Sequence, residues 1–222
     1  KNLGEMLFAA GRIDAWLANF RRFEEHCPDA LPLAVQALEA CQHQADFAKL
    51  DRYLEGLRKE RFRARNEDEL VDCLEELLYL LLFFDIEPEM MLRFAQTYDQ
   101  AAARVYGAVL PRPITRRPGP VRVGYLSADL RNHVMGKMMW QAIAHHDRAS
   151  FELHFYANQR ESDAWTQRFE AAGKRFVAIA GMDDRAAVAT IVDDDLDLLV
   201  DLSTHTRGAR PGILARKPAR VQ

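Results

Sequence analysis

The sequence predicts two structural classes in one chain, an all-α region followed by an α/β lobe built on a parallel sheet. Apolar residues recur at helical spacing over residues 1–110, whereas short β-rich runs alternate with helical patterns over residues 121–222. Residues 111–120 between them are rich in proline, a composition typical of a linker. We therefore predict a helical region (1–110), a linker (111–120) and a Rossmann-like lobe (121–222).

The apolar pattern of the helical region repeats along the chain. The first helix pair places apolar side chains at Leu7, Ile13, Trp16, Phe20 and Phe23. About 34 residues later, the period of tetratricopeptide repeats, the matching positions hold Cys41, Phe47, Leu50, Leu54 and Leu57. Such helix pairs bury their apolar faces against their neighbours, so the pattern predicts a tetratricopeptide-like array. A generic helical bundle is the alternative, because the second copy lacks the glycine and closing proline of the first.

Further elements follow in a regular order. Helices are expected over 67–84, with an acidic start at residues 66–69, and over 88–106. In the lobe we expect strands at 121–127, 151–157, 174–179 and 196–202, separated by helices at 135–146, 163–172 and 184–193. The second of these helices is expected to be capped near Ser162. The last strand is apolar enough to be buried on both faces. Residues 219–222 resemble the start of a fifth strand, so we expect the lobe to continue past Gln222.

Composition excludes several classes of protein. The net charge of −3 argues against nucleic acid as the main partner. No stretch is long and apolar enough to span a membrane. The three cysteines lie far apart, without the spacing of a disulfide framework or a zinc site, which favours a reducing, cytoplasmic setting. No signal peptide is recognisable at the start of the chain.

Polar residues gather in two segments that follow predicted strands. Asp129, Asn132 and His133 follow the first strand, and a second segment, residues 201–210, follows the fourth. Because the carboxyl ends of parallel strands meet at one edge of the sheet, we expect both segments there, where ligands bind. Each feature also has a structural interpretation. Asp129 could cap the next helix, and the basic residues between Arg207 and Arg220 could be solvated.

Several catalytic motifs are absent from the sequence. The first strand-to-helix turn contains no dinucleotide-binding G-x-G-x-x-G, and the chain has no P-loop and no nucleophile elbow. No residues have the spacing of metal ligands. The sequence therefore predicts neither a metal nor a cofactor.

Two segments resemble a known family. V-R-V-G-Y-L-S-A-D-L-R-N-H-V-M-G, starting at Val121, resembles the opening of the catalytic region of O-GlcNAc transferases and their SPINDLY-like relatives. The segment from Leu196 to Gln222 resembles the one that ends their first lobe. The resemblance implies the front half of a two-lobed (GT-B) glycosyltransferase that transfers a sugar to Ser or Thr of proteins. UDP-GlcNAc is the leading donor, and GDP-fucose and UDP-glucose stay open. The transfer inverts the anomeric carbon and needs no metal.

The resemblance also assigns site residues. His133 matches the active-site histidine of the family, which lies against the donor sugar and phosphate and has been assigned as general base. Asp129 matches a carboxylate also proposed for proton removal or relay, and either group could remove the proton of an acceptor hydroxyl. Asn132 and Val134 flank that histidine. Residues expected to line the donor and acceptor cleft are His205, Thr206, Arg207 and Gly208. Ser203 and Thr204 depart from the family pattern, which has glycine at the second of these positions.

The resemblance implies a nucleotide sugar and acceptor proteins as partners, with acceptors held by the helical repeats. The nucleotide-holding lobe would lie beyond Gln222, so the chain by itself is expected to be inactive. Two alternatives stay open, a non-catalytic repeat-type binding module and a protein N-glucosyltransferase of the adhesin-modifying type. The sequence does not reveal the donor sugar, the acceptor, or whether the chain forms a homo-oligomer.

Overall fold

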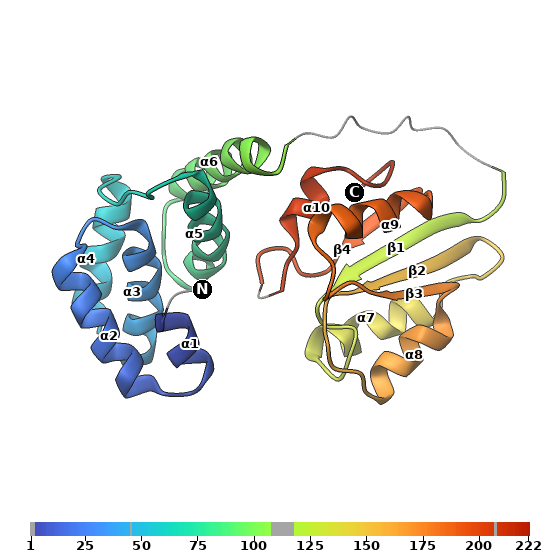
Figure 1. Cartoon of the computed structure of the whole chain (residues 1–222), viewed down its shortest axis with the longest axis horizontal. Coiled ribbons are helices and arrows are strands. Elements are labelled where there is room, and N and C mark those ends of the chain that lie inside the picture. Colours follow the sequence, from blue (N-terminus) through green and yellow to red (C-terminus); the bar gives the residue numbers. More distant parts are fainter. Residues whose placement is uncertain (1–2, 45, 108–117, 207) are drawn as a thin grey trace. The chain divides into compact units, whose positions relative to one another are not determined.

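The computed structural model describes residues 3–44, 46–107, 118–206 and 208–222. The chain divides into two compact units, Lys1–Val105 (unit 1) and Tyr106–Gln222 (unit 2) (Figure 1). Most of the predicted linker, 111–120, lies outside the described residues.

Unit 1 is all-helical. Its elements are α1 (Leu3–Ala9), α2 (Ile13–His26), α3 (Leu31–Gln44), α4 (Phe47–Arg58), α5 (Glu67–Leu80), the 3-10 helix η1 (Leu81–Phe83) and α6 (Pro88–Tyr106). One apolar core joins the helices, and its fully buried side chains include Leu33 of α3 and Leu77 of α5. Asn66 caps α5 by accepting the N–H of Glu69, as the acidic start of that helix predicts.

The repeated apolar pattern corresponds to a repeated pair of helices. Helix α4 begins at Phe47, 34 residues after the start of α2 at Ile13. Trp16 and Phe20 are buried in α2 and their counterparts Leu50 and Leu54 are buried in α4, because the same helical face meets the core in both copies. The matched pair at the start of these two helices differs. Ile13 packs against the core, whereas Phe47 is 70% exposed.

Unit 2 is a four-stranded parallel sheet with helices on both faces. Its elements are β1 (Val121–Ser127), α7 (Val134–Ala144), β2 (Phe151–Ala157), α8 (Ala164–Ala172), β3 (Arg175–Ala178), α9 (Asp184–Asp193), β4 (Leu198–Asp201) and α10 (Pro211–Ala215). The strand order is β3-β2-β1-β4, with every pairing parallel. Helices α7 and α8 cover one face of the sheet and α9 and α10 the other (Figure 1).

Each face of the sheet has its own core. On one face, Ile143 of α7 and Phe169 of α8 pack against Phe155. On the other, Ile191 of α9 and Ile213 of α10 pack in the cluster that contains Tyr156 and Leu199. The predicted fold class, a helical region followed by a parallel α/β lobe, is therefore confirmed.

Two local predictions need correction. The fourth strand is shorter than 196–202 and lies at the sheet edge, where Leu198 and Val200 are partly exposed, so it is not buried on both faces. Val221 makes a parallel bridge to Leu198, in keeping with the strand-like start predicted for 219–222. The cap of α8 is Asp163 rather than Ser162, because Asp163 shares a capping box with Thr166.

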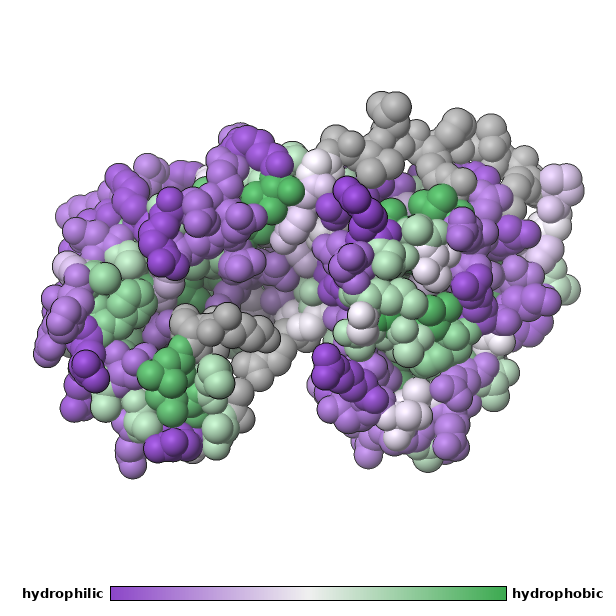
Figure 2. Space-filling view, viewed as in Figure 1, coloured by the Kyte–Doolittle hydropathy of each residue, from purple (hydrophilic) through white to green (hydrophobic). Residues whose placement is uncertain are grey.

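The visible surface is mostly hydrophilic, with apolar residues in separate patches (Figure 2). Within the described parts of the chain, no helix combines the length and apolar character needed to cross a bilayer.

Candidate functional site at the carboxyl edge of the sheet

The two polar segments lie at the point where the chain reverses its direction of travel across the sheet. From β1 the chain moves outward through β2 and β3, and it then returns to place β4 on the other side of β1. Leu126 of β1 pairs with Asp201 of β4, so both strands end at the same edge. Open α/β sheets bind their ligands at this kind of switch point. The predicted common edge of the two loops is confirmed.

The first loop folds into a compact turn after β1. The hydroxyl of Ser127 accepts the N–H of Asp129 at 3.0 Å, and the N–H of His133 donates to the carbonyl of Arg131 at 2.7 Å. Gly136, in the first turn of α7, lets the helix approach this turn. A Cβ at that position would lie 2.5 Å from the Arg131 carbonyl oxygen and 2.7 Å from that of Asp129. The turn thus rests directly on the start of α7.

His133 is the N-cap of α7. Its Nδ1 accepts the N–H of Met135 at 3.3 Å, and Oδ2 of Asp129 lies 3.4 Å from the same nitrogen. The cap interpretation of Asp129 is therefore wrong, because the histidine occupies that position. The contact with Met135 fits the tautomer with its proton on Nε2, whereas the contact with Asp129 fits a proton on Nδ1. The imidazole is 41% exposed.

Asp129 is the more enclosed member of the pair. Its carboxylate is 15% exposed and also lies 3.5 Å from the guanidinium of Arg131. The next residues predicted for the site, Asn132 and Val134, are both exposed. The backbone N–H of Asn132 donates to Oδ2 of Asp163 at 2.7 Å.

The second loop is shaped by the carboxylate of Asp201. Its two oxygens accept the N–H groups of Ser203 and Thr204 at 3.1 and 2.8 Å. Asp201 therefore stabilises a turn. Thr204 has a φ of 51°, in the left-handed region, at the position where the resembling family has glycine. The hydroxyl of Thr206 donates to the carbonyl of Ser203 at 2.6 Å and closes the turn.

His205 lies in this turn with its side chain half-buried. Burial lowers the pKa of His205 below 6.5, and the nearby carboxylate of Asp201 opposes the shift only in part. The imidazole is consequently neutral at pH 7. Arg207, also predicted for the site, lies outside the described residues.

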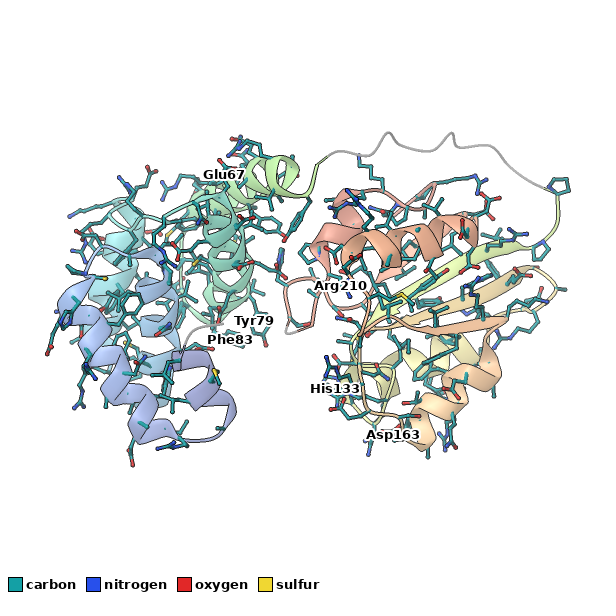
Figure 3. All side chains as sticks on the ribbon, viewed as in Figure 1. Glu67, Tyr79, Phe83, His133, Asp163 and Arg210 are labelled. Atoms are coloured by element: carbon teal, nitrogen blue, oxygen red, sulfur yellow. The ribbon has the colours of Figure 1, made fainter. Side chains whose placement is uncertain are left out.

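The two loops touch each other. The N–H of Ala128 donates to the hydroxyl of Ser203 at 3.3 Å. Gly208, with a φ of 90°, packs so closely that an added Cβ would lie 2.6 Å from that of Ala128. Figure 3 shows His133 and Arg210 along the same edge of unit 2. The structure therefore brings Asp129, His133, His205 and Gly208 to one rim.

Two of the basic residues after β4, Arg210 and Arg220, are held by protein groups, whereas Lys217 is exposed. Arg210 donates to the carboxylate of Asp184 at 2.7 Å, to Asn158 at 3.0 Å and to two backbone carbonyl groups. Arg220 pairs with Asp195 at 2.7 Å and is largely buried. A guanidinium has five N–H donors and can bind several acceptors at once. The two arginines therefore attach the chain after β4 to residues 158, 184 and 195.

Sequence reasoning missed Asn158, Gln159 and Asp163, which follow β2 and contact the two loops. The carboxyl end of β2 lies at the same edge as those of β1 and β4, since Ser127 pairs with Ala157. Position after a parallel strand was therefore a usable signal.

No group of three or more histidine, cysteine, aspartate or glutamate residues able to hold a metal ion occurs in the part of the chain that the structure describes.

Comparison with known proteins identifies the lobe. Residues 107–222 match glycosyl transferase family 41. The chain belongs to this family. An Arabidopsis thaliana protein named as a probable UDP-N-acetylglucosamine–peptide N-acetylglucosaminyltransferase, SEC, is 31% identical over 113 residues, which cover 50% of this chain. A rice protein with the same probable activity, SPINDLY, is 28% identical over 134 residues, or 59% of the chain.

The fold of this family-41 chain is also similar to a solved structure. A Thermobaculum terrenum O-GlcNAc transferase mutant superimposes on 99% of the chain with a TM-score of 0.76 and 25% identity. The predicted kinship with O-GlcNAc transferases and SPINDLY is therefore confirmed. The chain spans 42% of that solved protein and 12% and 14% of the length of SEC and rice SPINDLY.

Proposed function

We propose that this chain is the acceptor-side half of a protein O-glycosyltransferase that transfers GlcNAc from UDP-GlcNAc to Ser or Thr hydroxyls. The observation that carries the proposal is the Asp129–His133 pair, with 3.4 Å between Oδ2 and Nδ1, at the switch point of a family-41 lobe. The names of the related proteins support the donor and the peptide acceptor.

The reaction is a single displacement. The acceptor oxygen attacks the anomeric carbon, the bond from that carbon to the diphosphate breaks, and the nucleoside diphosphate leaves with the bonding electrons. Attack on the face opposite the leaving group inverts the configuration. The proposed reaction uses no metal ion, so hydrogen-bond donors of the protein have to stabilise the negative charge that develops on the diphosphate.

Within this scheme the two residues have different roles. We propose the tautomer in which Nδ1 of His133 accepts the N–H of Met135, so that Nε2–H is a donor toward the donor sugar or its phosphate. The carboxylate of Asp129 is then the group free to accept the proton of the acceptor hydroxyl. This assignment makes Asp129 the base and His133 the electrophilic partner.

The remaining predicted residues would line the cleft. Thr206 and Gly208 hold the second loop in shape, and neutral His205 offers a hydrogen bond without adding charge. Val134 and Asn132 are exposed beside the histidine. Arg207 is proposed to contribute positive charge toward the diphosphate.

Turnover would need more than this chain. The chain covers 42% of the similar solved transferase, so we propose that a second, nucleotide-holding lobe completes the cleft and that the chain by itself is nearly inactive. We further propose that the helical unit is a tetratricopeptide-like array that binds acceptor proteins. The three free cysteines support a reducing, cytoplasmic setting.

The test is a transferase assay on the full-length protein with UDP-GlcNAc and a Ser/Thr peptide library. We expect His133→Ala and Asp129→Asn each to lower kcat by about 100-fold or more, the range of lost acid–base or electrostatic help. The matched control is His145→Ala, an exposed histidine that ends the same helix. Wild-type rates in both site variants would refute the proposal. Transfer only to asparagine would identify an N-glycosyltransferase instead.

A further inference from the structure

We propose that Asn158 and Gln159 are positioning residues that hold the two site loops in register with each other. They follow β2 directly, and each side-chain amide binds the backbone of a different loop. The inference rests on the proposed function for its catalytic consequence. The hydrogen bonds that carry it are independent of that function.

Gln159 clamps the first loop. Its Oε1 accepts the N–H of Leu130 at 2.9 Å, and its Nε2 donates to the carbonyl of Leu130 at 2.7 Å. Gln159 is 8% exposed and Leu130 is 0% exposed, so water cannot replace these bonds. One side chain thus satisfies both backbone polar groups of a fully buried residue in an irregular turn.

The clamped residue lies next to the proposed base. Leu130 directly follows Asp129 and precedes the turn that leads to His133. Fixing both of its backbone groups fixes the peptide planes on either side, and with them the backbone from which the Asp129 side chain projects. Asp163 adds a second hold on the same turn through the N–H of Asn132.

Asn158 holds the second loop. Its Nδ2 donates to the carbonyl of Gly208 at 2.9 Å, and its Oδ1 accepts from Arg210 at 3.0 Å. Its own N–H donates to the carbonyl of Ser127 at 2.7 Å, which ties it to the end of β1. Consecutive side chains of an extended chain point to opposite sides, which explains how two neighbouring amides reach two different loops.

Two isosteric variants separate the clamps. Gln159→Glu and Asn158→Asp keep the acceptor oxygen but remove the N–H donor to the loop carbonyl, placing a carboxylate oxygen against it. Gln167→Glu makes the same charge change at an exposed position of α8 and is the matched control.

The first measurement is amide hydrogen exchange on the 222-residue chain, which does not depend on activity. We expect Gln159→Glu to speed exchange about 10-fold or more in residues 128–133 and not in 208–210, and Asn158→Asp to do the reverse. Equal acceleration of both segments in either variant, or none, would overturn the proposal. If Gln159→Glu does not fold, Gln159→Asn, neutral but too short to reach both groups, takes its place.

The second measurement is steady-state kinetics on the full-length protein. We expect either variant to lower kcat about 10- to 100-fold, the effect of moving reacting groups by about 1 Å, with a smaller change in KM for the nucleotide sugar. Gln167→Glu should match wild type. If a variant speeds amide exchange in only one loop but leaves kcat unchanged, the positioning role is wrong. If the wild-type enzyme is itself inactive, the proposed function is wrong and the exchange result still stands.

Discussion

Replacing Gly136 with alanine tests whether the first loop is held against the start of α7. The new Cβ would lie 2.5 Å from the carbonyl oxygen of Arg131 and 2.7 Å from that of Asp129, where ordinary contacts begin at 3.4 Å. Both neighbours are backbone atoms, so no side chain can rotate away. The turn has to move by up to 3.4 − 2.5 = 0.9 Å.

Two opposing terms set the magnitude. Alanine gains up to about 1 kcal/mol over glycine within a helix. Overpacking of this kind costs about 1–3 kcal/mol. We therefore expect Gly136→Ala to lower the free energy of unfolding of unit 2 by up to about 2 kcal/mol. In the full-length enzyme kcat should fall by about 10- to 100-fold, because the turn carries Asp129 and leads to His133.

The assay is urea unfolding followed by hydrogen exchange in β1, which reports unit 2 separately from the helical unit. The control is Gly181→Ala, a glycine without positive φ and with no atom within 4 Å of the added Cβ. That variant should be unchanged or gain up to about 1 kcal/mol. If Gly136→Ala proved as stable as Gly181→Ala, the inferred contact between turn and helix would be wrong.

Three further predictions concern the second loop. Thr204→Gly should raise the free energy of unfolding by about 0.5–1 kcal/mol because it relieves a left-handed φ of 51°. The control Thr206→Gly removes a hydroxyl that donates to a carbonyl and should lower the free energy of unfolding. The opposite order in urea unfolding would contradict the strain argument. The imidazole of His205 should titrate below pH 6.5 by NMR, since burial lowers its pKa. Protonation then favours the unfolded chain, so the contribution of His205 to stability is complete above pH 6.5 and is lost as the pH falls toward the folded pKa. An NMR titration midpoint of His205 above pH 6.5 would refute the burial argument. Arg210→Met should cost about 2–4 kcal/mol because it leaves the partly buried carboxylate of Asp184 without its main cation. Arg216→Met removes a bond to the carbonyl of Gly212 and only a 3.9 Å contact with the same carboxylate, so it should cost about 1 kcal/mol or less; equal losses would contradict the special role of Arg210.

Periodicity allowed most elements to be predicted. The strands at 121–127 and 151–157 match their predicted bounds. The fourth strand was predicted too long and too buried, because an apolar run does not reveal whether a strand lies at the centre or the edge of a sheet. The basic run was misjudged for a related reason. Whether Arg210 is solvated depends on Asp184, which lies 26 residues earlier in the chain.

The candidate site was predictable in part. Asp129 and His133 could be selected because polar residues after a parallel strand lie at the ligand-binding edge. The choice between cap and functional group could not be made for them, since the cap of α7 depends on how the loop turns. Gln159 was missed for the same reason. A glutamine after a strand has no distinctive pattern until its amide is seen to pair with Leu130.

The sequence by itself determined the order of helical unit and parallel lobe, the family, and the two loops at the carboxyl edge, because periodicity and short motifs are properties of neighbouring residues. Only the tertiary structure decided the strand order β3-β2-β1-β4, and with it the switch point between β1 and β4. It also decided which groups contact Nδ1 of His133 and which side chains hold the loops. These features depend on contacts between residues distant in sequence, which local patterns do not specify.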